Sequence, residues 1–405
     1  MRLLHTSDWH LGKTLYDKRR HHEHEAFLVW LLTVLKDQAI DVLLICGDIF
    51  DTVSPSNAAL QLYYDFLRKA HDQGCRYIIV TGGNHDSPSL LEAPAAILQP
   101  LQVHVVGAKP KEVEQQLVVV RNEGGKPEAI VCAVPFLRDR DVRQFVENED
   151  SREKDQRLIN GIAEHYQQVH QAAHKLREEL SASIPIIHTG HLFAAGASAG
   201  EGVRDLYVGT AIQLNASLFP QEAAYIALGH LHKKQRVGST NHIYYSGSPL
   251  PMGFSELGRA KEVLIVEFEA EALVAVNALK IPQFQTLVSI VGDEDELIQH
   301  LNDLLKQNKS IWVEATCSTP FTPSLRLKLQ EIVQDSLVEL LRINTKEDQI
   351  DPLLQSLTAK TLEELDEKEV FLRRLDQENL TQEQQKHLIT LYQEVLHAIW
   401  EKEIS

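Results

Sequence analysis

Residues 41–51 read DVLLICGDIFD, an apolar run that ends in a glycine followed by two carboxylates. A continuous apolar run bounded by glycine is typical of a strand that is buried on both faces. Residues 76–86, RYIIVTGGNHD, repeat this pattern with a second apolar run and the pair Gly82 and Gly83. Polar residues placed directly after buried strands are typical of functional loops at the carboxyl ends of a sheet.

Helical patterns separate these strands. Residues 1–6 predict a short strand, and apolar residues recur with a helical period over 22–38 and 57–73. The resulting βαβαβ order predicts a sheet that is covered by helices. Farther along, the charged stretch 149–180 predicts a flexible tip and a long, solvated helix. The other strands are expected at 103–106, 117–121, 129–134, 184–190, 224–228, 242–246, 263–268 and 273–279.

A smaller pattern begins after Pro282, with strands and helices expected in turn at 286–291, 294–307, 310–316, 323–334 and 337–343. From residue 352 the chain is predicted to be helical, with capping-box sequences at 361–364 and 381–384. The apolar stripe of the last helix either packs on its own protein or holds a partner helix, and the pattern fits both. We therefore expect three parts, at 1–280, 281–350 and 351–405.

The composition is that of a globular protein with an acidic surface. The 405 residues carry a net charge of −17, which argues against a stand-alone DNA-binding protein because such proteins usually have a basic surface. The chain has no apolar run of membrane-spanning length, and its start has no signal-peptide core, so we expect a cytoplasmic protein. The four cysteines form no CxxC pair, and Cys46 and Cys132 are expected to be buried thiols.

Five short motifs of carboxylate, amide and imidazole residues each follow a predicted strand. Any one of them is most simply a hydrogen-bonded polar group at a strand end. Five together are hard to explain by packing, because buried polar groups cost free energy unless they are paired or bind metal. The motifs are Asp8-Trp9-His10, Gly47-Asp48-Ile49-Phe50-Asp51, Gly83-Asn84-His85-Asp86, Thr189-Gly190-His191 and Gly229-His230-Leu231-His232.

These residue types predict a site for divalent metal ions. Imidazole, carboxylate and amide oxygen without thiolate suit Mn, Fe, Zn or Mg rather than copper. Two ions about 3.5–4 Å apart need a bridging carboxylate and can hold both oxygens of an in-line phosphoryl displacement. Asp48 is the candidate bridge, because ligand-type residues are available on either side of its motif.

The motif order DxH, GDxxD, GNHD, GH and GHxH resembles the calcineurin-like metallophosphoesterase superfamily. The surrounding sequence resembles more narrowly the SbcD family of bacterial nuclease subunits, which act in double-strand-break repair. Matching stretches are frequent in residues 1–280. Beyond them the resemblance rests mainly on the order of the predicted parts. It implies a β-sandwich flanked by helices, a small α/β capping domain that binds DNA and a helical tail that binds a partner. The matching stretches include TSDWHLGK, CGDIFDTVSPS, VTGGNHDSPS, TGHLFAAGAS and YIALGHLHKKQ.

The resemblance also implies a role for each motif residue. One ion would be held by Asp8, His10, Asp48 and His232, and the other by Asp48, Asn84, His191 and His230. His85 would face the phosphate without binding an ion and would help the departing oxygen to leave. The implied activity is exonuclease action on duplex ends and endonuclease action on hairpins and single strands, with two Mn²⁺ ions preferred and Mg²⁺ as the alternative.

The chain contains no Walker A motif, so ATP dependence would come from a partner. The resemblance implies an SbcC-type ATPase with a long coiled coil, in a complex with two copies of each subunit, and a dimer of the nuclease subunit. Local basic side chains would contact the duplex ends and hairpins. The alternative is that these side chains are exposed to solvent and have no role in DNA binding. The candidates are Lys13, Lys18, Arg19, Arg20, Lys233, Lys234 and Arg236.

Several neighbouring residues have a second interpretation. His188 competes with His191 as ligand, although the Gly-His step of the family favours His191. Asp51 is expected to hydrogen-bond a ligand rather than bind metal. The remaining expectations are a loop-fixing Asp86, a packed Trp9, an ordinary strand histidine at His104, and an exposed polar turn at 19–25, RRHHEHE, rather than a metal cluster.

Two other functions use the same superfamily fold. A protein or nucleotide phosphatase keeps the metals but changes the substrate, and the extra α/β unit and tail argue against it. A scaffold without activity would be expected to have lost some ligand residues, which are all present here. Activity on a linear duplex rather than on a nitrophenyl phosphodiester or a phosphoprotein would distinguish a nuclease from a phosphatase. Metal analysis would distinguish an active enzyme from a scaffold.

Overall fold

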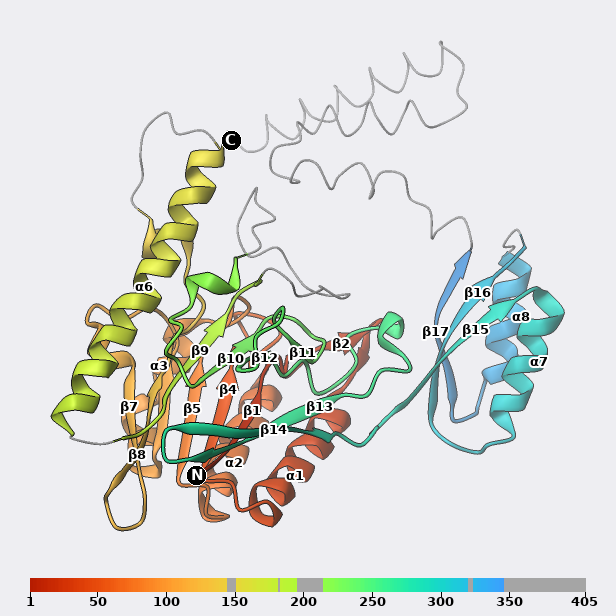
Figure 1. Cartoon of the computed structure of the whole chain (residues 1–405). Coiled ribbons are helices and arrows are strands. Elements are labelled where there is room, and N and C mark those ends of the chain that lie inside the picture. Colours follow the sequence, from red (N-terminus) through yellow and green to blue (C-terminus); the bar gives the residue numbers. More distant parts are fainter. Residues whose placement is uncertain (144–150, 181–182, 195–213, 320–322, 346–405) are drawn as a thin grey trace, which may run out of the picture. The chain divides into compact units, whose positions relative to one another are not determined.

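The computed structural model describes residues 1–143, 151–180, 183–194, 214–319 and 323–345. Two six-stranded sheets form its larger part, in the orders β14-β13-β1-β4-β5-β6 and β11-β12-β10-β9-β8-β7 (Figure 1). The first sheet contains β1 (Arg2–Thr6), β4 (Val42–Cys46), β5 (Tyr77–Thr81), β6 (Val103–Val106), β13 (Glu262–Glu269) and β14 (Ala272–Lys280). The second contains β7 (Leu117–Arg121), β8 (Pro127–Cys132), β9 (Ile186–His191), β10 (Tyr225–Gly229), β11 (Gln235–Arg236) and β12 (Ile243–Tyr245).

The two sheets pack face to face as a sandwich. Leu44 and Ile79 from the first sheet and Val131 and Ile187 from the second belong to one buried apolar cluster. The central strands of each sheet are parallel, β1 with β4 and β5, and β8 with β9 and β10. Loops that follow the carboxyl ends of these strands are therefore gathered at the end of each sheet.

Helices cover both outer faces of the sandwich (Figure 1). On the first sheet lie α1 (His21–Asp37) and α2 (Asn57–Asp72), which bury apolar residues such as Phe27 and Phe66. The start of α2 is fixed by Ser56, whose hydroxyl accepts a hydrogen bond from the Ala59 N–H. On the second sheet lies α6 (Ser151–Glu179).

Helix α6 corrects one expectation, since it is not a solvated helix. Leu158, Ile162, Tyr166 and Val169 recur at helical spacing and are fully or almost fully buried against the second sheet. The charged residues between them hid this stripe in the sequence. The helix therefore stabilises the sandwich as α1 and α2 do on the other side.

A separate three-stranded parallel sheet follows, with the order β15 (Thr286–Gly292), β16 (Ile311–Cys317) and β17 (Val338–Thr345). Helices α7 (Glu294–Leu305) and α8 (Pro323–Val333) bury Leu297, Leu301 and Leu329 in its core. A capping box between Asp293 and Glu296 begins α7. The predicted helices beyond residue 352 lie outside the described residues.

The predicted strands and helices that fall within the described ranges are confirmed, with ends that differ by at most two residues. The short strands and α-helices that were not predicted are β2 (Thr14–Leu15), β3 (Lys18–Arg19), α3 (Pro88–Glu92), α4 (Ala95–Leu98), α5 (Asp139–Val142) and β11 (Gln235–Arg236). Cys46 and Cys132 are buried as expected. Over the described residues, the chain forms no helix with the length and hydropathy of a membrane span.

Candidate metal centre

The five motifs meet in one cluster, although they follow five different strands. The first three follow β1, β4 and β5 of one sheet, and the other two end β9 and follow β10 of the opposite sheet. Every motif residue predicted to act at the site is buried except Asn84, which is half-buried. The cluster contains Asp8, His10, Asp48, Asn84, His85, His191, His230 and His232.

One side of the cluster is formed by Asp8, His10 and His232, whose ligand atoms all lie within 4.8 Å of one another. His10 Nε2 lies 3.3 Å from His232 Nε2 and 3.6 Å from Asp48 Oδ2. Both oxygens of the Asp8 carboxylate accept hydrogen bonds. Oδ1 accepts one from the His230 backbone N–H at 2.9 Å. Its Oδ2 accepts from the Ser7 hydroxyl at 2.5 Å.

The other side is formed around His191. Its Nε2 lies 3.4 Å from Asp48 Oδ2 and 2.9 Å from Asn84 Oδ1. The His230 ring packs edge-on against it, with ring centroids 5.3 Å apart. Asp48 Oδ2 thus has His10 on one side and His191 on the other, which is the position that a bridging ligand needs.

These separations are those of donor atoms that share an ion. Two donors at about 2.0–2.1 Å from one ion lie about 2.9 Å apart in octahedral and about 3.3 Å apart in tetrahedral coordination. The facing Nε2 atoms of His10 and His232 can be joined by one shared proton or can both bind a cation between them. The donor set of imidazole, carboxylate and amide oxygen also fits divalent ions.

The backbone is held in an unfavourable conformation at the same residues. Positive φ angles occur at Asp8 (53°), His10 (46°), Asp48 (50°) and His230 (100°). The left-handed region costs a non-glycine residue on the order of 1–2 kcal/mol, and such residues concentrate at functional sites. The fold therefore holds these four side chains in position although their backbone conformation costs free energy.

The glycine of the third motif is required by close packing. A Cβ on Gly83 would lie 2.1 Å from Asp48 Oδ1 and 2.3 Å from the Asp48 backbone nitrogen. Real Cβ atoms essentially never approach other atoms so closely. Gly83 therefore lets the loops after β4 and β5 touch, so that Asp48 and Asn84 reach the same cluster.

Charge is balanced inside the metal-free cluster. Burial would raise the pKa of Asp48, but the His191 and His10 imidazoles hold it well below its ordinary value. Burial would lower the pKa of His191, but the Asp48 carboxylate raises it to about 9. Burial also raises the pKa of Asp8. A proton on His191 therefore offsets the Asp48 charge until a cation replaces it.

Asp51 orients a candidate ligand from outside the cluster. Its Oδ1 lies 3.2 Å from His10 Nδ1 and 3.1 Å from Lys13 Nζ. His10 thus presents one nitrogen to a carboxylate and the other to the cluster, an arrangement that fixes the ring of a metal-binding histidine. The position fits the expected role of Asp51 beside His10, and that role stays a prediction because Asp51 also shares a group of possible metal-binding side chains with His10 and His85.

His85 lies at the edge of the cluster. Its Nδ1 lies 2.8 Å from the Asp51 carbonyl oxygen and therefore donates to it. Its Nε2 lies 4.0 Å from Asp48 Oδ2, and its ligand atoms come within 4.8 Å of those of His10 and Asp51. The ring packs edge-on against His10 at 4.8 Å between centroids.

Comparison with known proteins identifies the family. Residues 1–234 match the family model described as calcineurin-like phosphoesterase, and residues 283–379 match one described as Type 5 capsule protein repressor C-terminal domain. The chain is 37% identical to the SbcD subunit of the SbcCD nuclease of Escherichia coli strain K12, over 98% of both chains. This chain belongs to the SbcD family.

Another SbcD family member, from the SbcCD nuclease of Bacillus subtilis, is 35% identical over 66% of both chains. Among solved structures, a dimetal phosphatase from Danio rerio matches with a TM-score of 0.36 and 12% identity, over 69% of this chain and 98% of that one. Membership of the SbcD family makes the chain a metal-dependent phosphodiester hydrolase with a nuclease role.

His188 and His191 point to different sides of β9. His188 Nε2 lies 3.1 Å from His170 Nδ1, in the layer under α6. His191 lies in the cluster, so the structure separates the two histidines that the sequence left in competition. Trp9 packs against Phe27 and Phe66, and His104 stacks on Tyr77, as expected of non-catalytic residues.

The stretch 19–25 corrects another expectation, because part of it is buried. Arg20, Glu23 and His24 are at most 6% exposed. Arg20 Nε lies 2.7 Å from Glu23 Oε2, and its Nη1 donates to the Pro251 carbonyl oxygen. Arg20 therefore holds the start of α1 against the loop at Pro251, and this buried ion pair removes it from the candidate DNA contacts.

Sequence reasoning missed two groups that support the cluster. Ser246 Oγ lies 2.8 Å from Ser7 Oγ, which itself donates to Asp8. Lys261 Nζ donates to the His232 carbonyl oxygen at 2.9 Å and pairs with Glu256 at 2.7 Å. A serine and a lysine outside the motifs carry no local pattern that predicts such contacts.

Proposed function

We propose that this chain is the nuclease subunit of an SbcCD-like complex that cuts DNA. In this proposal, residues 1–280 form the nuclease domain, 281–350 a capping domain that contacts DNA, and 351–405 a tail that binds the partner. The observation that carries the proposal is the gathering of eight motif residues at the carboxyl ends of strands from both sheets of one sandwich. The relatives from Escherichia coli and Bacillus subtilis, whose names describe a nuclease, support a nucleic acid as the substrate.

The proposed ligands divide into two sets. Asp8, His10 and His232 hold one ion, while Asn84, His191 and His230 hold the other, and Asp48 bridges them. Mn²⁺ is the ion we propose, with Mg²⁺ as the alternative. When bound, two such ions position a phosphodiester and lower the pKa of a water aligned for in-line attack. Asp51 holds the His10 ring, and Lys261 holds the loop that carries His232.

His85 is the proposed general acid. Its Nδ1–H donates to the Asp51 carbonyl oxygen, so Nε2 is the nitrogen turned toward the cluster. A proton held at Nε2 passes to the departing oxygen as the P–O bond breaks. In this proposal His85 is not a ligand, and its Nε2, 4.0 Å from Asp48 Oδ2, supports a place beside the ions.

The decisive experiment is cleavage of a labelled hairpin duplex by the purified chain in Mn²⁺. Wild type and a control, Asp65→Asn on the exposed face of α2, are expected to cleave it, and Asp48→Asn is expected to be inactive. Equal cleavage by Asp48→Asn would refute the bridging role. A metal-loaded wild type that spares DNA, with the ATPase partner present, but hydrolyses a nitrophenyl phosphodiester or a phosphoprotein would favour a phosphatase.

The proposed partner is an SbcC-type ATPase with a coiled coil, joined as two copies of each subunit around a dimer of this chain. ATP dependence then comes from the partner and adds exonuclease action on duplex ends to endonuclease action on hairpins and single strands. Deletion of residues 352–405 is expected to spare Mn²⁺-dependent single-strand cleavage and to abolish co-purification with the ATPase. A complex that survives the deletion would show that the tail is not the binding element.

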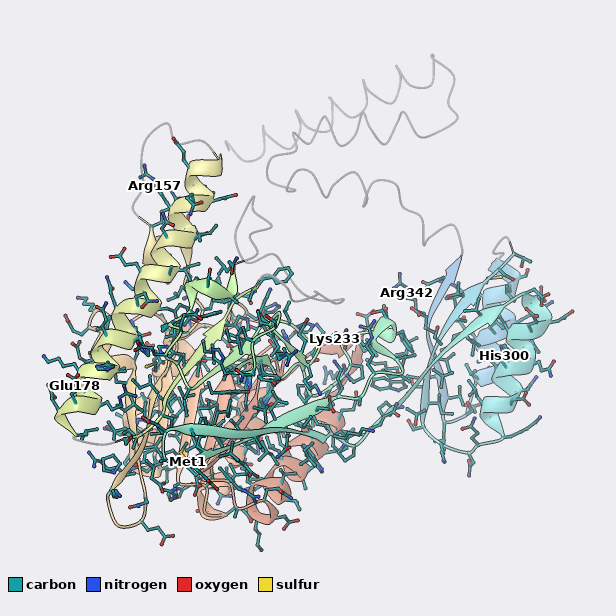
Figure 2. The ribbon with its side chains drawn as sticks, viewed as in Figure 1. Met1, Arg157, Glu178, Lys233, His300 and Arg342 are labelled. Atoms are coloured by element: carbon teal, nitrogen blue, oxygen red, sulfur yellow. The ribbon has the colours of Figure 1, made fainter. Side chains whose placement is uncertain are left out.

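DNA would approach the cluster beside exposed cations. Lys233 follows the candidate ligand His232 directly, and both Lys233 and Arg236 are exposed (Figure 2 labels Lys233). Lys234 is instead paired with Glu262 at 3.0 Å. Because the chain carries a net charge of −17, local cations such as these are needed to offset the phosphates.

A further inference from the structure

His232 borders a pocket as well as the motif cluster. Its Nε2 faces His10 Nε2 at 3.3 Å in the cluster, and the residue also lines a pocket of about 170 Å³. A pocket of this volume can hold several water molecules and therefore has room for a phosphate group. It is formed by the segments before β11, after β12 and leading into β13. The charged side chains that line it are Lys233, Lys234, Glu256, Arg259, Lys261 and Glu262.

These side chains give the pocket a positive charge. Four cations and two carboxylates leave a net charge of +2, on a chain whose net charge is −17. Lys234 is paired with Glu262 at 3.0 Å. Lys233 and Arg259 are exposed, and within the described part of the chain neither is paired with a carboxylate (Figure 2 labels Lys233). These two cations are therefore available to an anion that enters the pocket.

Lys261 fixes the wall of the pocket. Its side chain is only 10% exposed, and its Nζ donates to the His232 carbonyl oxygen at 2.9 Å and to Ser248 Oγ at 2.8 Å. The same Nζ pairs with Glu256 at 2.7 Å. A lysine ammonium has three N–H donors, so all three are in use. Lys261 thus holds the segment that carries His232, while the exposed cations remain for a ligand.

We propose that this pocket binds one backbone phosphate of the DNA strand, the one next to the phosphate cut at the cluster, and that Arg259 holds it. This inference rests on the proposed function and adds a second contact with the same substrate. A guanidinium presents its N–H donors in a planar fork that fits two phosphate oxygens. Exposed cations are usually only solvated. Arg259 differs because it lines a pocket that shares His232 with the proposed ion site.

Cleavage of a strand with one neutral linkage tests the proposal. A labelled single-stranded oligonucleotide is cut in Mn²⁺ by wild type, Arg259→Ala, Arg259→Lys and the control Arg68→Ala, which changes an exposed arginine on α2. The same strand is also made with one methylphosphonate linkage, which carries no charge. The products are separated by length, so cleavage on each side of this linkage is measured on its own. Circular dichroism and metal analysis check that each variant is folded and loaded.

In wild type and Arg68→Ala, we expect the methylphosphonate to slow cleavage about tenfold at one of the two flanking linkages, because a charge-assisted contact is lost. Arg259→Ala is expected to cut the unmodified strand about tenfold more slowly. The methylphosphonate should then have no further effect on that variant. Arg259→Lys should keep part of the effect, because it keeps the charge. Metal content should be the same in all four proteins.

Equal sensitivity of Arg259→Ala and wild type to the methylphosphonate would overturn the role of Arg259. If wild type cuts both flanking linkages as fast as in the unmodified strand, there is no such subsite. Loss of metal from Arg259→Ala would make this residue a support of the cluster and also overturn the proposal. All three results leave the proposed function intact, because wild type still cuts the unmodified strand. A metal-loaded wild type that leaves that strand uncut would overturn the proposed function and this inference with it.

Discussion

The Nε2 atoms of His10 and His232 face each other at 3.3 Å, although the two residues are 222 positions apart in sequence. Two neutral imidazoles can share one proton at this distance, but a divalent cation satisfies both lone pairs at once. His10 is also held from behind by Asp51, at 3.2 Å from its Nδ1. The two histidines therefore bring the first and fifth motifs together, and Asp51 sets the orientation of the His10 ring.

Asp51→Asn is expected to weaken Mn²⁺ binding by about 10–100-fold, because the amide no longer fixes His10 as a charged carboxylate does. Cleavage should recover when Mn²⁺ is raised, since the ligand atoms themselves remain. The measurement is the Mn²⁺ dependence of hairpin cleavage, with Asp65→Asn as the matched control. An unchanged Mn²⁺ dependence in Asp51→Asn would argue against this orienting role.

His85→Gln is expected to reduce turnover by about 10²–10⁴-fold, the range for loss of a positioned proton donor. Metal occupancy should stay at the wild-type level, because in the proposed assignment His85 is not a ligand. Single-turnover rates and metal analysis of the same preparation give the two quantities. If the variant loses metal, His85 is a ligand and the assignment is wrong.

Metal binding is expected to release a proton from His191. In the metal-free protein the pKa of His191 is raised to about 9 by Asp48, so the ring is protonated at pH 7 and must lose its proton to bind. Mn²⁺ affinity should therefore rise as the pH rises toward about 9, by up to about tenfold per pH unit. Titration calorimetry at pH 7 in two buffers of different ionisation enthalpy measures the released proton. Identical heats in both buffers would contradict it.

Lys233→Ala is expected to weaken binding of DNA uniformly across sequences. Loss of one phosphate contact should reduce the slope of log affinity against log salt concentration by about one. Binding of a labelled duplex in Ca²⁺, at several salt concentrations, gives this slope. Lys69→Ala, an exposed lysine on α2, is the control. A slope that stays at the wild-type value would make Lys233 an ordinary solvated residue.

The sequence predicted the strands well because they are continuous apolar runs that end in glycine and polar residues. It also predicted which residues meet, since motifs after parallel strands lie at the ends of those strands. It did not predict that α6 is buried, because charged residues outnumber the apolar stripe of Leu158, Ile162, Tyr166 and Val169. A stripe of this kind becomes visible only when the helix is placed against a sheet.

Contacts between distant loops were beyond sequence reasoning. Lys261 reaches the His232 carbonyl, and Arg20 reaches the Pro251 carbonyl, and neither contact has a local signature. The choice between His188 and His191 depended on which side of β9 each occupies near the strand end. They are three positions apart, so in an extended strand their side chains point to opposite faces.

Gly83→Ala is expected to abolish Mn²⁺ binding at the bridge although it adds only one methyl group. The new Cβ would lie 2.1 Å from Asp48 Oδ1 and 2.3 Å from the Asp48 backbone nitrogen. Relief of this clash has to move backbone, because the obstructing atoms include the Asp48 main chain. Overpacking of this kind costs about 1–3 kcal/mol of stability, so the domain should still fold. Gly124→Ala is the matched control, since its Cβ would meet no atom closer than 3.4 Å. Metal analysis and thermal unfolding of both variants give the answer: a folded Gly83→Ala protein with full metal content would mean that Asp48 can move without losing its ions.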